Sequence, residues 1–83
     1  MPFKLYILYS ASLNIYYVGH TNDLERRLPE HNSGQTKSTK AGRPWKLVYT
    51  KGFKTKKEAF AEERRIKKMK SRKYIEQLIR SAR

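Results

Sequence analysis

The sequence predicts an α+β domain in which a small three-stranded antiparallel sheet is flanked by about three helices. Two β-branched and aromatic runs near the N-terminus are separated by a short polar link, and a third lies near the middle of the chain. Apolar residues with helical spacing follow the second and third runs. Because 83 residues suffice for one small core, we expect a single domain over residues 1–83.

The first two strands are predicted to form a hairpin. Phe3–Tyr9 and Ile15–Gly19 are rich in residues that favour extended backbone, and the polar link Ser10–Asn14 has turn residues at both ends. This spacing predicts an antiparallel pair with a loop of roughly five residues. We expect Gly19 to end the second strand, because glycine adopts backbone angles that other residues avoid.

A first helix is predicted from about Asn22 to Asn32. Thr21 or Asn22 can cap it, and Glu25 stands three residues after Asn22 as the reciprocal partner of a capping box. Pro29 lies inside this helix, where it removes one backbone hydrogen bond and favours a bend.

The same helix presents two side chains that carry chemistry. Arg27 and His31 stand four residues apart and therefore share a face, beside an apolar stripe formed by Leu24 and Leu28. The order of strand, glycine and helix is expected to bring strand tyrosines close to this arginine and histidine.

Residues 32–43 are polar, glycine-containing and basic, which predicts a mobile loop. It either contacts phosphates or is a solvated loop without a role. Its candidate phosphate contacts are Lys37, Lys40 and Arg43. After the loop, Trp45–Tyr49 alternates apolar and polar residues and predicts a third strand that extends to Phe53.

Two further helices are predicted at the C-terminal end. Thr55 and Glu58 have the spacing of a capping box, so a helix begins there and continues to about Lys70. Ser71 resembles another cap. The apolar residues that give the last helix its amphipathic spacing are Tyr74, Ile75, Leu78, Ile79 and Ala82.

The charge of the chain indicates a polyanionic partner. Lysine and arginine number 20 against 7 aspartate and glutamate residues, for a formal net charge of +13. Such a field on a small domain is typical of nucleic-acid-binding proteins, and an anionic membrane or an acidic protein is the less favoured alternative. The C-terminal residues 51–83 hold 13 of the 20 basic side chains, as either a phosphate-binding surface or the solvated faces of two helices.

Composition also excludes several classes of function. The absence of cysteine excludes thiol catalysis, disulfide bonds and thiolate metal sites. No nucleophile elbow or glycine-rich phosphate cradle is present. No apolar segment could span a bilayer and no signal peptide precedes the first strand, so we expect a cytoplasmic protein.

The remaining residues permit a site built on one metal ion. The chain has a single aspartate, Asp23, which disfavours two-metal chemistry, and only His20 and His31 could bind zinc. One carboxylate could instead hold a hard divalent ion completed by water, with an arginine neutralising charge on a phosphate. Glu62 and Glu63 are the candidates, about 50° to either side of the apolar direction of their helix. Periodicity does not choose between them, and either could form a salt bridge to a neighbouring helix.

Five features in order resemble the GIY-YIG nuclease domain, a family found in the excision-repair nuclease subunit, homing endonucleases and small stand-alone bacterial proteins. Lys4-Leu5-Tyr6 stands where the first signature triplet is expected and keeps its tyrosine. Tyr17-Val18-Gly19 matches the second triplet with a conservative change.

The other features of the resemblance lie on the predicted helices. The segment from Asn22 to Leu28, followed by His31 and Asn32, is similar to the family helix whose catalytic arginine is three residues after a leucine, here Arg27. Glu58-Ala59 followed by Glu63 resembles the metal-binding helix, and this resemblance selects Glu63 as the ligand.

The resemblance implies hydrolysis of a DNA phosphodiester with one divalent ion, Mg²⁺ or Mn²⁺. By position, Tyr17 would be the general base or would orient the attacking water, with Tyr6 beside it and His31 assisting. Arg27 would be the catalytic arginine, and Glu63 would hold the metal. From the residues alone, the alternatives are core packing for both tyrosines and a surface position for the histidine.

The predicted partner is DNA, in branched, flapped or damaged form. The side chains expected to contact it are His20, Arg26, Lys37, Lys40, Arg43, Lys67 and Lys70. The first alternative is a basic module on the same fold that binds DNA or RNA without catalysis. The second is an interaction protein for an acidic partner.

Overall fold

The computed structural model describes residues 2–82. Its strands are β1 (Phe3–Ser10), β2 (Ile15–Thr21) and β3 (Trp45–Phe53), and its helices are α1 (Leu24–Ser33), the 3-10 helix η1 (Lys37–Gly42), α2 (Lys56–Met69) and α3 (Arg72–Ser81). The strands form one antiparallel sheet in the order β2-β1-β3, with β1 in the centre. The predicted α+β class, with three antiparallel strands and three α-helices, is confirmed. No helix of the described chain combines the length and apolar character needed to cross a membrane.

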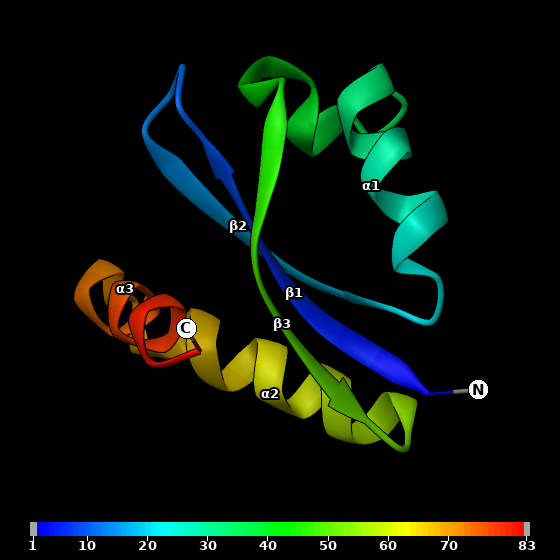
Figure 1. Ribbon diagram of the computed structural model, residues 1–83, viewed down its shortest axis with the longest axis vertical. Coiled ribbons are helices and arrows are strands. Elements are labelled where there is room, and N and C mark those ends of the chain that lie inside the picture. The colour runs from blue at the N-terminus through cyan, green and yellow to red at the C-terminus, as the bar shows by residue number, and fades with distance from the viewer. Residues whose placement is uncertain (1, 83) are drawn as a thin grey trace.

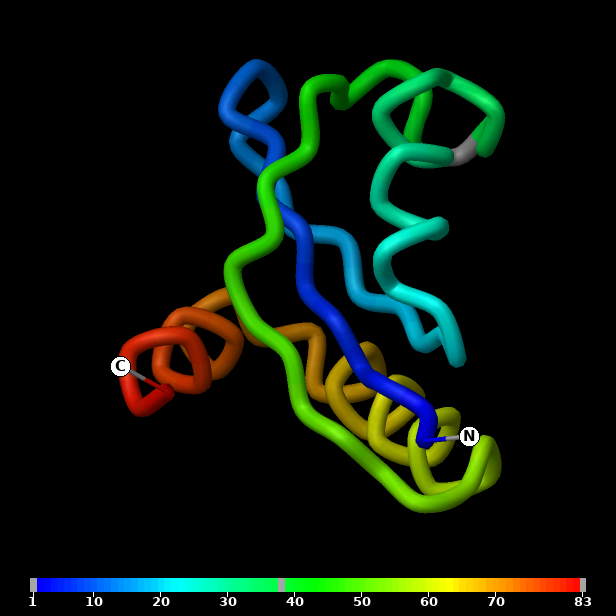
Figure 2. The backbone as a smooth tube through the Cα atoms, turned by 45° about the vertical axis from the view of Figure 1, so that its right-hand side comes forward, coloured from blue at the N-terminus to red at the C-terminus, as the bar shows by residue number. Residues whose placement is uncertain are grey.

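The sheet separates two apolar layers, with α1 over one face and α2 and α3 over the other (Figures 1 and 2). Leu5 and Ile7 of β1 pack with Ile66 of α2. Tyr6 and Leu8 point to the opposite face and pack with the two leucines of α1. The period-2 alternation of β1 therefore decides which side chains meet which helix.

Both hairpin strands are longer than predicted. β1 includes Ser10 and β2 continues to Thr21, so four residues connect them. Gly19 does not end β2 but pairs with Tyr6, and its φ lies outside the left-handed region. The expectation that this glycine supplies special backbone angles is wrong. Its missing side chain matters instead, because a Cβ at Gly19 would lie 2.7 Å from the Tyr6 hydroxyl oxygen.

The predicted cap of α1 is also wrong. The Asp23 side chain accepts a hydrogen bond from the backbone N–H of Arg26, so the cap is neither Thr21 nor Asn22. Consequently Glu25 does not occupy the reciprocal position of a capping box. The Thr21 hydroxyl oxygen accepts from the backbone N–H of Asp23 at 3.1 Å and stabilises the turn before the helix.

The caps of α2 and α3 are confirmed. Thr55 accepts from the backbone N–H of Glu58, and Ser71 accepts from that of Tyr74. Both helices begin one residue after these caps, so the local signals were sufficient here.

The segment predicted as a loop over residues 32–43 is partly helical in the structure, because residues 37–42 form η1. Trp45 holds this segment against the sheet. Its indole Nε1 donates to the Thr39 carbonyl oxygen at 2.6 Å, and its backbone N–H donates to the side-chain oxygen of Asn32 at 2.6 Å. Gly42 packs so tightly on the indole that a Cβ there would clash with it. This long-range packing carries no local sequence signal.

Candidate active site

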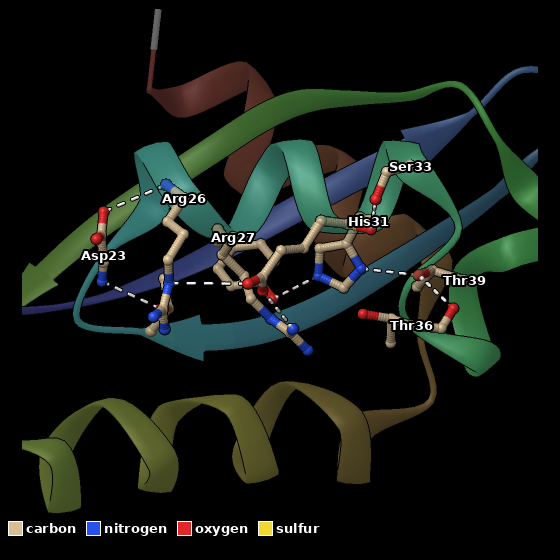
Figure 3. A network of polar contacts seen from close by, with 10 residues as sticks. Asp23, Arg26, Arg27, His31, Ser33, Thr36 and Thr39 are labelled. Atoms are coloured by element: carbon tan, nitrogen blue, oxygen red, sulfur yellow. Dashed lines mark hydrogen bonds and ion pairs between the residues drawn. The ribbon is translucent and has the colours of Figure 1, made fainter.

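The five predicted catalytic side chains come from four elements: Tyr6 from β1, Tyr17 from β2, Arg27 and His31 from α1, and Glu63 from α2. α1 and α2 cover opposite faces of the sheet (Figure 1). Side chains of both helices nevertheless meet at the edge strand β2, where the Tyr17 ring packs against His31 of α1 and lies 5.8 Å from the ammonium of Lys67 of α2. In Figure 3 Arg27 and His31 both leave α1 on the side that faces β2.

A buried polar chain connects β1, α1 and η1. The Tyr6 hydroxyl lies 2.9 Å from His31 Nε2, and His31 Nδ1 lies 2.8 Å from Thr39 Oγ1. Thr39 Oγ1 in turn donates to the carbonyl oxygen of Thr36 at 3.3 Å (Figure 3). Because the threonine proton is used in this way, His31 carries its own proton on Nδ1 and accepts from Tyr6 through Nε2.

Burial controls the protonation of this chain. It raises the pKa of Tyr6 to about 12, although the nearby Arg27 guanidinium acts in the opposite direction. Burial also lowers the pKa of His31 below its ordinary value of 6.5, and the positive charge of Arg27 adds to that effect. At neutral pH the phenol is therefore protonated and the imidazole neutral, as the tautomer requires.

Tyr17 is the more accessible of the two phenols. It is half-buried, whereas Tyr6 is 1 % exposed. The ring centroid of Tyr17 lies 5.0 Å from that of His31 and 6.4 Å from that of Tyr6. The ammonium of Lys67 lies 5.8 Å from the Tyr17 centroid. This places Tyr17 between the buried polar chain and the charged residues of α2.

Gly19 makes room for this arrangement. A Cβ there would meet the Tyr6 hydroxyl at 2.7 Å and the Tyr17 ring at 3.2 Å. We expect Gly19→Ala to lower the free energy of unfolding by about 1–3 kcal/mol, the usual effect of overpacking, in urea denaturation. Gly52→Ala on β3 is the control, because its Cβ would meet nothing within 4 Å. Equal stability of the two variants would contradict this role of Gly19.

Glu63 lies nearly buried and is held by two nitrogens. Its Oε1 lies 2.6 Å from His20 Nδ1, and its Oε2 accepts from Lys67 Nζ at 2.7 Å. The side chain of Glu63 is only 12 % exposed. Lys67 thus contacts both this carboxylate and the ring of Tyr17, which brings the predicted metal ligand next to the predicted base.

The other candidate, Glu62, has a different environment. It accepts two hydrogen bonds from Arg65, which lower the pKa of its carboxyl group. Arg65 also donates to the Tyr74 hydroxyl of α3 at 2.8 Å. Glu62 therefore takes part in joining α2 to α3, on the side of the helix away from Tyr17.

Arg27 is one-third exposed and only partly engaged. One guanidinium nitrogen donates to Glu30 Oε1 at 3.0 Å. The positive charge of the group opposes the rise in the pKa of Tyr6 that burial causes. Since a guanidinium has five N–H donors, the remaining ones are available to a phosphate.

The donor set at Glu63 fits a hard divalent cation. Among the described residues no group of three or more histidine, aspartate or glutamate side chains could hold a metal ion. Mg²⁺ does not require such a group, because it is commonly bound by one or two carboxylates, water and substrate phosphate. Glu63 offers one such carboxylate, and its two oxygens lie beside nitrogen atoms of His20 and Lys67.

The predicted nucleic-acid contacts separate into groups. Lys37, Lys40 and Arg43 line a cavity of about 750 Å³ beside η1. Lys67 and Lys70 line a second, of about 380 Å³, between β2 and the junction of α2 with α3. The two remaining residues are engaged within the protein: His20 contacts Glu63, and Arg26 pairs with Glu30.

Two functional features were missed from the sequence. Thr39, which fixes the tautomer of His31, lies in a polar segment that was predicted as a loop. The pairing of Glu63 with His20 joins residues 43 positions apart. Neither of these two contacts has a local signal in the sequence. A third contact, the ion pair of Glu63 with Lys67, could have been predicted, because the two residues stand four positions apart on one helix.

The fold and these side chains define a GIY-YIG catalytic domain. Residues 2–75 match that family, and the chain belongs to it, which confirms the predicted resemblance and suggests a nuclease.

Similar proteins carry the name UPF0213. One from Bacillus velezensis is 44% identical over 72 residues, covering 82% of this chain and 73% of that protein. One from Streptococcus pneumoniae is 48% identical over 56 residues, covering 66% of this chain and 57% of that protein. The solution NMR structure of the UPF0213 protein from Bacillus halodurans superposes with a TM-score of 0.60 at 38% identity, covering 95% of this chain and 83% of that one.

Proposed function

We propose that this protein is a metal-dependent DNA endonuclease that hydrolyses phosphodiester bonds, on branched or damaged DNA. The observation that carries the proposal is the position of Lys67, which contacts the Glu63 carboxylate at 2.7 Å and lies 5.8 Å from the Tyr17 ring centroid. A carboxylate and an accessible phenol thus share one site.

Each side chain of the site has a different role in the proposed reaction. Arg27 stabilises the negative charge that develops on the phosphate. Tyr17, the accessible phenol, orients the attacking water and takes part in removing its proton. Tyr6 donates to the neutral His31, so this buried pair fixes the surroundings of Tyr17 and keeps an imidazole able to accept a proton. A Mg²⁺ or Mn²⁺ ion held by Glu63 would supply Lewis-acid polarisation of the phosphate.

The charge of the protein supports a nucleic-acid substrate. The net charge is +13, and lysines line two cavities, one beside η1 and one that Tyr17 also lines. Phosphate contacts of this kind give affinity without sequence preference, which suits recognition of DNA shape.

The test is a nicking assay on supercoiled and branched DNA with Mg²⁺ or Mn²⁺, and with a chelator. We expect cleavage by the wild type to require the metal, and Arg27→Ala to cleave about a hundredfold more slowly, since it removes a charge-stabilising group. Arg80→Ala is the matched control, because it removes the same charge from an exposed position of α3 that is not among the predicted DNA contacts. All three proteins should bind DNA.

Equal, low cleavage by all three proteins would indicate a contaminating nuclease. Retained binding of DNA or RNA would then favour the non-catalytic module on the same fold. Binding of polyglutamate in preference to nucleic acid would favour an acidic protein partner instead.

A further inference from the structure

We propose that Lys67 is the internal counter-ion of Glu63, occupying Oε2 of the carboxylate until a divalent cation displaces it. The inference rests on the proposed function and assigns Lys67 a role beyond contacting DNA. It follows from the two contacts of Glu63 and from the difference between the groups that make them.

The Glu63 carboxylate needs compensation in the free protein. Its side chain is 12 % exposed, and a carboxylate removed from water is unstable unless it is paired. His20 Nδ1 occupies Oε1 at 2.6 Å, and Lys67 Nζ occupies Oε2 at 2.7 Å. Each carboxylate oxygen thus already has a nitrogen beside it, and an incoming cation competes with these two partners for the carboxylate.

The two partners differ in how readily they can leave. His20 comes from β2, its side chain is 19 % exposed, and its ring packs 5.5 Å from that of Phe60. Lys67 lies one turn after Glu63 on the same helix, and its flexible side chain is 51 % exposed. An exposed ammonium returns to water with little loss, whereas the packed imidazole keeps the carboxylate oriented. Oε2 is therefore the oxygen that becomes available.

The displaced ammonium of Lys67 can move into a neighbouring cavity. Lys67 also lines the cavity of about 380 Å³ beside β2, together with Lys70 and Arg72. A DNA phosphate in this cavity would attract Lys67 away from Glu63 and reduce the repulsion between these cations and an incoming metal. DNA and the divalent cation should consequently bind with positive coupling.

The experiment measures Mn²⁺ affinity of the DNA-free protein by titration calorimetry. We expect Lys67→Met to bind Mn²⁺ about tenfold more tightly than the wild type, because the competing cation is gone. Lys67→Arg should resemble the wild type, and Glu63→Gln should lose the binding. Lys68→Met is the matched control: it removes the same charge from the next, exposed position of α2, which makes no ion pair among the described residues. Thermal unfolding checks that each variant is folded.

Equal affinity of Lys67→Met and Lys68→Met would overturn the proposal, and so would undetectable Mn²⁺ binding to Lys67→Met. The two proposals fail separately. Tighter Mn²⁺ binding by Lys67→Met with no DNA cleavage by any protein would support the counter-ion and refute the nuclease. Metal-dependent cleavage by the wild type, together with an unchanged Mn²⁺ affinity of Lys67→Met, would support the nuclease and refute the counter-ion.

Discussion

Glu63→Gln is expected to slow DNA nicking about a thousandfold while leaving DNA binding intact. Glutamine keeps the size of the side chain and one oxygen that can accept from Lys67, so the local packing is preserved. It removes the negative charge that would hold the metal ion beside Tyr17. Loss of one preorganised electrostatic group at a reacting centre slows catalysis by about 10²–10³, and loss of the metal ligand places this variant at the upper end.

Glu62→Gln supplies the control, because it changes the neighbouring carboxylate in the same way. Glu62 binds Arg65, which links α2 to Tyr74 of α3, so this substitution should lower stability slightly and leave nicking nearly unchanged. Similar rates for the two glutamine variants, measured as initial nicking velocities, would contradict the assignment of Glu63.

Where the sequence predicted the fold correctly, the signals were local. The β-branched and aromatic composition of β1, the threonine and serine caps of α2 and α3, and the short hairpin each involve residues close in the chain. Propensity and periodicity report these interactions directly.

Two of the errors arose where distant residues decide the structure. η1 forms because Trp45 packs on Gly42 and donates to Thr39, and Gly19 is required because Tyr6 of the neighbouring strand approaches it. The cap of α1 was misplaced by one or two residues, because Thr21, Asn22 and Asp23 are all good caps and only the turn geometry selects Asp23.

The candidate site was predicted in the same uneven way. Helical spacing correctly placed Arg27 and His31 on one face, but it left Glu62 and Glu63 equivalent. Their difference depends on position relative to the sheet: Glu63 reaches His20 at the β2 edge, whereas Glu62 lies toward α3. The resemblance to the family selected Glu63, and the catalytic role of each residue stays a prediction until the variants are measured.

The buried pair of Tyr6 and His31 is expected to limit stability at both ends of the pH range. The pKa of Tyr6 rises from 10.0 to about 12 on folding, so between these values the unfolded chain loses a proton that the folded protein keeps. Stability from this group is complete below pH 10 and is lost as pH approaches 12, by about 2–3 kcal/mol. For His31 the folded pKa is lowered, so its contribution is complete above pH 6.5 and is lost as pH falls through the folded value.

Urea denaturation across this pH range, in the wild type and Tyr6→Phe, measures both effects. The variant lacks the ionising hydroxyl, so its alkaline decline should be smaller than that of the wild type by about 2–3 kcal/mol. Its acid decline should persist, because His31 is still buried beside Arg27. An alkaline decline of equal size in both proteins would mean that Tyr6 ionises as readily when folded as when unfolded. The hydroxyl would then not be the buried, protonated donor to Nε2 of His31.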